Sequence, residues 1–358
     1  MNCVSGMIYT ESGFIEGHIC FEEGIVTEVC EGPAERSDLQ GLILPAFTNA
    51  HTHIADYIVP VNLNLSLEEL VAPPNGFKHR MLNEAPEAKL RQGIATMSEY
   101  MFKHGTTSFI DFREGSVPGA KLLSSAEWSQ PTIMGKPSSF AEEELSALLK
   151  VSDGFGPSAI SDWDYDDLTE LARLARAHGK LFGIHCSERV REDIGKVLDL
   201  KPSFVVHMTK ATREDLEACV EEKVPIVSCP RSNMFFGSEP PLKEMLDVGA
   251  TVALGTDNAM ISMPDLLCEA EFAARILRKQ GAVKLDEVVQ MIASNGRKII
   301  NHKQKIWIKP RDRCNFTVIE NKNGDPVTDL VLRNAGAAPL MVCSGKTIWR
   351  RERNEPVQ

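Results

Sequence analysis

The sequence predicts an α/β protein: a (β/α)8 TIM-type barrel with a small discontinuous β-sandwich domain formed by both chain ends. Three observations predict it. Strand-like and helix-like segments alternate through the middle of the chain, both ends are rich in strand signals, and several strands end in a metal-binding side chain. A doubly wound sheet is the competing architecture. It usually has a glycine-rich phosphate loop after its first strand, and the sequence has neither GxGxxG nor GxxxxGK[ST].

The two ends of the chain carry short β-type runs separated by turn residues. We expect them to pair in one small domain of residues 1–44 plus 306–358, leaving residues 45–305 for the barrel. The alternative is two unrelated tails. The predicted end strands are residues 4–10, 18–21, 25–29, 315–319, 328–332 and 339–348, with a turn at 321–325.

The middle of the chain supplies about eight strand–helix units, which fits a barrel of this size. Thr212 and Asp215 form a capping-box pattern that predicts a helix start. The predicted strands are residues 107–111, 132–134, 155–161, 182–185, 204–207, 225–228 and 251–255, and the clearest helices are 166–178, 212–222 and 286–300.

Composition narrows the class of protein. The chain has 358 residues and a formal net charge of -11, which argues against nucleic-acid binding. No apolar run approaches the ~20 residues that span a bilayer, and we expect no secretory leader. The nine cysteines are scattered without a paired spacing, so we expect reduced thiols and a cytoplasmic protein. The absence of Cys-x-x-Cys argues against a structural zinc ribbon. We expect a small-molecule substrate. A homo-oligomer is compatible with the sequence.

Four predicted strands lead into metal-competent side chains. His51 and His53 follow the first strand, and residues i and i+2 of a strand share a face. His185, His207 and Asp257 end three later strands, and the carboxyl ends of barrel strands meet at one rim. Three imidazoles and a carboxylate suit Zn²⁺, and also Fe²⁺ or Mn²⁺. Taken singly, each histidine has the alternative of an ordinary core or surface residue.

These segments resemble the amidohydrolase superfamily, in its deaminase and chlorohydrolase branch, near the cytosine, guanine and adenosine-type deaminases. The resemblance covers nearly the whole middle of the chain and agrees with a β-sandwich built from both ends. The matching segments are residues 44–53, Gly105-Thr106-Thr107-Ser108-Phe109-Ile110-Asp111, His185-Cys186-Ser187-Glu188, His207, Cys229-Pro230-Arg231-Ser232-Asn233, and residues 252–257.

The resemblance implies roles for these residues. His51, His53, His185 and Asp257 would bind one metal ion, zinc or iron. Glu188 would act as proton shuttle, and His207 would position the activated water. Binuclear members use a carboxylated lysine on the fourth strand; residues 155–161 contain none and Lys136 follows the third strand, which favours one metal.

The residues themselves are chemically consistent with these roles. A bound divalent metal can lower the pKa of its water to about 7, and Asp257 is placed to accept a proton from that water. Glu188 could protonate a ring nitrogen and then the departing amine. Two alternatives stay open: His207 as a further metal ligand, and Glu188 as a surface carboxylate beside Arg189 and Arg191.

Basic residues offer clues to the substrate. Lys78, His79 and Arg80 lie in the segment after the first strand and could bind a carboxylate or phosphate, or could form a solvated cluster. Arg113 and Arg231, just past the second and seventh strands, could clamp an anion or pair with acids such as Glu114.

Departures from the family pattern argue against the familiar nucleoside substrates. Ser158 stands in the fourth-strand segment where many deaminases have histidine, and Asn258 stands where glycine is frequent. The leading hypothesis is hydrolytic deamination of a small N-heterocycle or an amidine-like group, in which activated water attacks and ammonia leaves. The alternatives are hydrolysis of a cyclic amide or of another C–N or C–Cl bond, and a barrel that binds without catalysis.

Overall fold

The computed structural model describes residues 2–71, 76–300, 306–322 and 324–352. The chain divides into two compact units. One comprises residues 1–48, 100–108 and 265–358, and the other comprises residues 49–99 and 109–264. The predicted domain boundaries at 44–45 and 305–306 stay a prediction.

The middle of the chain forms a parallel sheet that closes on itself. Its strand order is β12-β11-β10-β9-β8-β7-β6-β5-β13. The two ends of this order, β12 (Val252–Leu254) and β13 (Asp257–Asn258), belong to one short segment that pairs with β11 on one side and with β5 on the other. Residues 252–258 therefore act as the eighth strand, and the (β/α)8 barrel is confirmed. The other strands are β5 (Phe47–His53), β6 (Thr106–Arg113), β7 (Gln130–Gly135), β8 (Gly154–Phe155), β9 (Leu181–Cys186), β10 (Phe204–His207) and β11 (Ile226–Ser228).

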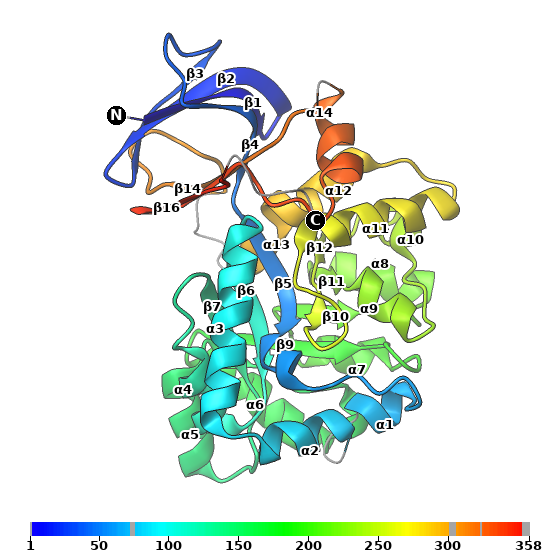
Figure 1. Ribbon diagram of the computed structural model, residues 1–358. Coiled ribbons are helices and arrows are strands. Elements are labelled where there is room, and N and C mark those ends of the chain that lie inside the picture. The colour runs from blue at the N-terminus through cyan, green and yellow to red at the C-terminus, as the bar shows by residue number, and fades with distance from the viewer. Residues whose placement is uncertain (1, 72–75, 301–305, 323, 353–358) are drawn as a thin grey trace. The chain divides into compact units, whose positions relative to one another are not determined.

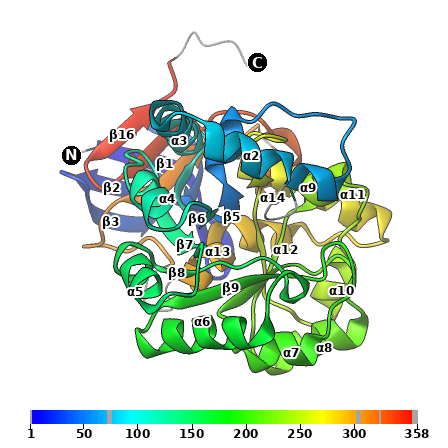
Figure 2. The same ribbon diagram turned by 90° about the horizontal axis from the view of Figure 1, so that it is seen from below.

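Helices follow the strands, as in other (β/α)8 barrels. In Figure 2, α5, α6, α7, α8 and α10 follow one another round the outside of the strands. The predicted capping box is confirmed, since Asp215 N–H donates to Thr212 Oγ1 and Thr212 N–H donates to Asp215 Oδ2. The helices of this unit are α1 (Leu67–Val71), α2 (Phe77–Glu84), α4 (Ser116–Leu123), α5 (Glu142–Val151), α6 (Tyr165–Ala177), α7 (Ile194–Asp199), α8 (Arg213–Glu221), α9 (Pro230–Phe235) and α10 (Leu242–Asp247), and α3 (Glu87–Lys103) ends in the other unit.

The fourth barrel strand is much shorter than the predicted residues 155–161. β8 holds only Gly154 and Phe155, and a 3-10 turn follows at Ile160–Asp162. Pro157 has no backbone N–H to donate to a neighbouring strand, so ladder pairing cannot continue through it. The segment around Ser158 is therefore a loop.

The strands of both chain ends form a separate seven-stranded sheet, ordered β16-β15-β14-β4-β1-β2-β3. Figure 1 shows its blue N-terminal and orange-to-red C-terminal strands in the same sheet. Its apolar core includes Phe21, Ile43 and Phe316, all essentially inaccessible to solvent. The strands are β1 (Asn2–Thr10), β2 (Gly13–Glu22), β3 (Ile25–Glu31), β4 (Leu39–Pro45), β14 (Asn315–Ile319), β15 (Met341–Ser344) and β16 (Thr347–Arg350).

Two predicted end strands need correction. Residues 339–348 are not one strand but contain β15, a turn and the start of β16. Residues 328–332 are helical, because α14 (Pro326–Thr328) runs into a π-turn at Asp329–Arg333. Asp325 caps this helix by accepting a hydrogen bond from the Thr328 N–H at 2.9 Å, and Pro326 occupies the first turn, where its missing N–H costs nothing. The predicted helix 286–300 is also a composite: α12 (Leu285–Gln290), a π-turn (Met291–Asn295) and α13 (Gly296–Ile300), preceded by α11 (Leu266–Lys279).

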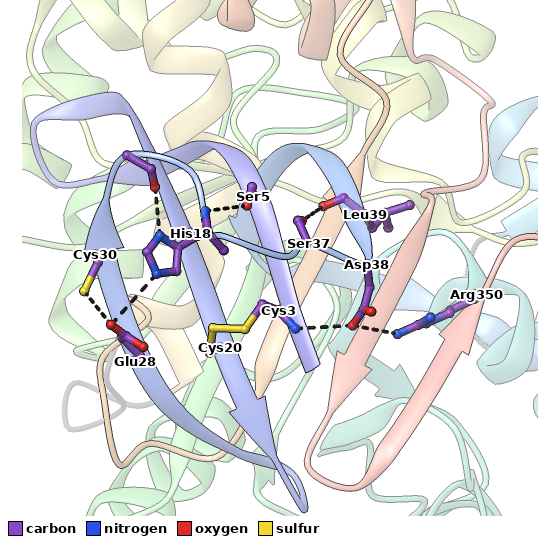
Figure 3. Close-up of a disulfide and its surroundings, with 12 residues drawn as sticks. Cys3, Ser5, His18, Cys20, Glu28, Cys30, Ser37, Asp38, Leu39 and Arg350 are labelled. Carbon is purple, nitrogen blue, oxygen red and sulfur yellow. Dashed lines mark hydrogen bonds and ion pairs between the residues drawn. A yellow bond between two sulfur atoms is a disulfide. The ribbon is translucent and has the colours of Figure 1, made fainter. Parts of the chain in front are cut away.

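A disulfide joins Cys3 of β1 to Cys20 of β2 (Figure 3). The two residues face each other in the antiparallel register, with their Cα atoms 4.1 Å apart. The expectation that all nine cysteines are reduced is therefore wrong for this pair. Residue spacing along the sequence could not reveal it, because the pairing depends on strand register. The cytoplasmic location stays a prediction, and no described helix is long and apolar enough to cross a membrane.

Candidate active site

Side chains from four barrel strand ends converge in unit 2. His51 and His53 project from β5 to the same place, and Asp257 arrives from residues 252–258. Asp257 Oδ1 lies 3.4 Å from His51 Nε2 and 3.6 Å from His53 Nε2. His185 and His207, from β9 and β10, complete the cluster, since ligand atoms of His51, His185 and His207 also lie within 4.8 Å of one another. The structure thus brings together all five residues that strand ends predicted.

The chemistry of this cluster fits a metal ion. His51 is completely buried, yet neither of its ring nitrogens makes a hydrogen bond with the described residues. An unsatisfied buried imidazole is costly unless something else binds its lone pair. Burial lowers the pKa of His51, of His185 and of His207, which keeps these rings in the neutral form that a metal requires. Neutral imidazoles beside an ionised carboxylate are the donor set of Zn²⁺ and its neighbours.

Hydrogen bonds behind the cluster hold the donors in orientation. His185 Nδ1–H donates to the Pro157 carbonyl at 3.1 Å, which leaves Nε2 for a ligand bond. Ser232 Oγ donates to Asp257 Oδ2 at 2.5 Å. Partners of this kind fix ring tautomers and carboxylate rotamers in metal sites.

The β5 backbone beside the two histidines is held by Asp111 of β6. Asp111 Oδ2 accepts from Thr52 Oγ1 at 2.9 Å and from the Ile54 N–H at 2.8 Å. Burial raises the pKa of Asp111 to about 6 in spite of these bonds. Asp111 therefore positions the strand that carries His51 and His53.

A second buried charge network lies against His53. Lys78 Nζ is 3.0 Å from Asp56 Oδ2 and 3.0 Å from Glu114 Oε1, and it is 3.5 Å from His53 Nδ1. Glu114 Oε1 also lies 3.4 Å from His53 Nδ1. Burial disfavours the charge of Lys78, but the two carboxylates outweigh burial and raise its pKa. Lys78 therefore stays charged, and carboxylates of the protein itself balance its charge.

Glu188 lies beside the cluster rather than at the surface. Its Oε1 is 3.6 Å from His207 Nε2. Burial, followed by the nearby charge of Asp257, raises the pKa of Glu188 to about 8. The alternative of a surface carboxylate paired with its arginine neighbours does not match the contacts: Arg189 pairs with Asp162 at 2.8 Å, and Arg191 pairs with Asp215.

His207 is held in a strained conformation. Its φ is 79°, and that of Asp257 is 58°, so both side chains leave their strands with left-handed backbone. Such strain is costly for residues other than glycine and collects at functional sites. The Asn233 side-chain N–H donates to His207 Nδ1 at 3.0 Å, which puts the ring proton on Nε2, facing Glu188. This tautomer suits a hydrogen-bond donor to water. The distances also allow His207 to serve as a ligand with His51 and His185.

A cavity of about 810 Å³, including space open to solvent, gives access to the cluster. Its wall includes three sets of residues: His53, His185, Glu188, His207 and Asp257 of the cluster; the charged or basic residues Lys78, His79, Glu114, Lys136, Asp162, Arg189 and Glu192; and Phe112, Gly156, Ser158, Ala159, Ser161 and Asn258.

Of the five residues predicted to contact the substrate, two line the cavity and three do not. Lys78 and His79 line the cavity, but they lie in α2 rather than in a loop, and Lys78 is already paired. Arg80 is exposed on α2 and is absent from the cavity wall. Arg113 and Arg231 are absent from it as well. Arg113 is buried near Gly119 O and Glu114, and Arg231 donates to Met263 O at 2.8 Å.

Lys136 is a cavity residue that sequence reasoning used only to argue about metal number. It directly follows the last residue of β7. The rule that selected the histidines, a polar side chain at the carboxyl end of a barrel strand, also selects Lys136.

Comparisons with known proteins identify the family of this chain. The model of the amidohydrolase family matches residues 42–347. Two archaeal relatives are each named "Putative aminohydrolase". The one from Archaeoglobus fulgidus is 36% identical over 79% of this chain and 82% of its own length. The one from Methanothermobacter thermautotrophicus is 31% identical over 93% and 94%. A 5-methylthioadenosine/S-adenosylhomocysteine deaminase from Moorella thermoacetica is 28% identical over 66% of this chain and 62% of its own.

Solved structures share the fold. An adenosine deaminase from Xanthomonas campestris with bound zinc has a TM-score of 0.78 at 14% identity, covering 97% of this chain and 92% of its own. A zinc complex of atrazine chlorohydrolase from Arthrobacter aurescens has a TM-score of 0.78 at 13% identity, covering 97% and 95%. With a family model that spans most of the sequence and a site that supplies the donors, the chain belongs to the amidohydrolase family and is a hydrolase acting on C–N bonds.

Proposed function

We propose that this protein is a zinc-dependent aminohydrolase that releases ammonia from a small N-heterocycle or an amidine-like compound. The observation that carries the proposal is the placement of Glu188, His207 and Asp257 within 4.8 Å of one another on the wall of one cavity. Hydrolytic deamination needs an activated water and a group that delivers a proton to the departing nitrogen. The site offers residues for both tasks.

The donors for the metal are His51, His53, His185 and Asp257. A divalent ion held there would lower the pKa of a water and polarise the carbon under attack. The remaining steps belong to side chains of the chain itself. Asp257 is close enough to His51 and His53 to accept a proton at the centre of the cluster. His207, with its proton on Nε2, orients the attacking water by donating to it.

Glu188 carries the proton to nitrogen. Burial raises the pKa of Glu188, which favours the protonated form that can donate to a ring nitrogen or an amine, as general acids do. The distance of 3.6 Å to His207 Nε2 lets the two groups share one water between them. Relatives named as deaminases and aminohydrolases support the same chemistry.

The experiment is an ammonia-release screen with purines, pyrimidines, pterins and guanidino compounds, combined with elemental analysis of the purified protein. We expect one metal ion per chain and stoichiometric ammonia from at least one compound class. Turnover without ammonia release would contradict deamination and would support hydrolysis of a cyclic amide or of a C–Cl bond. A pure protein without a stoichiometric transition metal, even after reconstitution, would support a non-catalytic binding barrel.

A further inference from the structure

Lys136 differs from the other cationic side chains on the cavity wall. Lys78 is held by two carboxylates at 3.0 Å, and Arg189 is held by Asp162 at 2.8 Å. His79 Nε2–H donates to the Val71 carbonyl at 3.1 Å, and burial lowers the pKa of His79 to about 4, so it is neutral. Within the described ranges, Lys136 Nζ has no carboxylate within ion-pair distance; its contact is with the ring face of Trp163, 5.6 Å from the ring centre.

Three carboxylates of the wall, those of Glu114, Asp162 and Glu192, already have partners of their own. Glu114 is bound by Lys78 and His53. Glu192 accepts from the Ser187 N–H at 3.0 Å and from the Ser161 N–H at 3.1 Å. A partly buried ammonium without an ion-pair partner is unfavourable in a folded protein, unless it is kept for a ligand.

The backbone and its neighbours hold Lys136 in place. The Lys136 N–H donates to the Arg113 carbonyl at 3.0 Å, which fixes the residue at the end of β7. Trp163, whose ring lies against the ammonium, also donates its Nε1–H to Ser158 Oγ at 2.8 Å. Ser158 lines the cavity, and because its oxygen accepts from Trp163, its own proton is left to donate. The Lys136 ammonium and the Ser158 hydroxyl are therefore both in contact with the Trp163 side chain.

We propose that Lys136, assisted by Ser158, binds an anionic group of the substrate, so that the protein acts on an acidic compound, a carboxylate or a phosphate, in preference to a neutral one. The inference rests on the proposed function in taking this cavity as the substrate site. It also explains the departure at Ser158, where many deaminases have a histidine: a hydroxyl there completes an anion site. The acidic group and the scissile C–N bond would belong to one small molecule that occupies the cavity.

The test compares matched probe pairs that differ by one anionic group: pterin with pterin-6-carboxylate, and adenosine with adenosine 5′-monophosphate. Binding is measured by calorimetry on metal-free protein, and ammonia release is measured on zinc-loaded protein. We expect the acidic member of at least one pair to bind about 10- to 100-fold more tightly, as charge-assisted hydrogen bonds do. The pair that shows the preference distinguishes carboxylate from phosphate.

Variants assign the preference to the residue. Lys136→Met should reduce it to within about threefold while leaving affinity for the neutral member and zinc content unchanged. Lys150→Met is the matched control, because Lys150 is an exposed lysine of α5 outside the cavity wall. Circular dichroism checks that both variants are folded.

Three results would overturn the inference: equal or weaker binding of both acidic probes by the unmodified protein, failure of both acidic probes to bind, or an acid preference that Lys136→Met retains. None of these results would contradict the proposed deamination, because ammonia release from neutral compounds does not depend on the anion site. Conversely, a Lys136-dependent acid preference without ammonia release would support the anion site and contradict the proposed deamination.

Discussion

Glu188 Oε1 lies 3.6 Å from His207 Nε2, and both side chains come from the ends of neighbouring barrel strands. Replacing Glu188 with glutamine keeps the shape of the side chain but removes the proton it can move. We expect kcat to fall by about 10²- to 10⁴-fold, the usual contribution of general acid–base catalysis. Metal content should stay at the level of the unmodified protein. Glu214→Gln, on the exposed side of α8, is the control and should change neither quantity.

The metal cluster predicts a different signature for its donors. His51→Ala and Asp257→Ala should each abolish stoichiometric metal binding as well as activity, because each removes a donor from a buried set. Elemental analysis after dialysis measures this directly. His104→Ala is the control: His104 stacks on Tyr100 in the other unit, so its loss should leave metal content intact. Full metal retention by His51→Ala would contradict the assignment.

Lys78 is expected to act in folding rather than in substrate binding. Lys78→Met leaves the buried carboxylate of Asp56 without its counter-charge and leaves Glu114 with only Arg113, 3.8 Å away, and breaking such a network costs about 3–5 kcal/mol. Chemical denaturation of metal-free protein measures the loss. Arg80 lies two residues after Lys78, on the exposed side of α2. Arg80→Met should therefore change the free energy of unfolding by less than about 0.5 kcal/mol. An unchanged stability of Lys78→Met, with weakened ligand binding, would return Lys78 to the substrate site.

Asp111 predicts a pH dependence of stability. Burial raises its pKa to about 6, above the unfolded value of 3.8, so the folded protein holds this proton more tightly. Its stabilising contribution is complete below about pH 4 and is lost as the pH rises through about 6. We therefore expect the stability of the metal-free protein, measured relative to Asp111→Asn, to fall by up to about 3 kcal/mol between pH 4 and pH 7. Parallel curves for the two proteins would show that Asp111 does not titrate in this range.

Local sequence patterns identified much of this molecule. The His51-Thr52-His53 spacing, the strand ends at His185, His207 and Asp257, and the Thr212 capping box all depend on interactions within a few residues. A strand alternates its faces and parallel strands end at one rim, so the donor cluster follows from position along each strand. The short fourth strand and the helix at residues 326–333 were missed because single residues override strand propensity there. Pro157 has no N–H for a strand hydrogen bond, and Asp325 caps a helix by accepting from the Thr328 N–H.

Only the tertiary structure decided which cationic side chain pairs with which carboxylate. Lys78, Arg113 and Lys136 are all cationic residues near the predicted site, and the sequence offered the first two as candidate anion binders. The fold placed carboxylates of Asp56 and Glu114 beside Lys78, buried Arg113 behind the wall, and left Lys136 facing the cavity against Trp163. The energy of a buried charge depends on which opposite charges lie within a few ångströms, and those distances join residues far apart in the chain. The sequence by itself determined the fold class and the residues that converge at the rim, whereas three-dimensional packing determined which cations are paired with carboxylates.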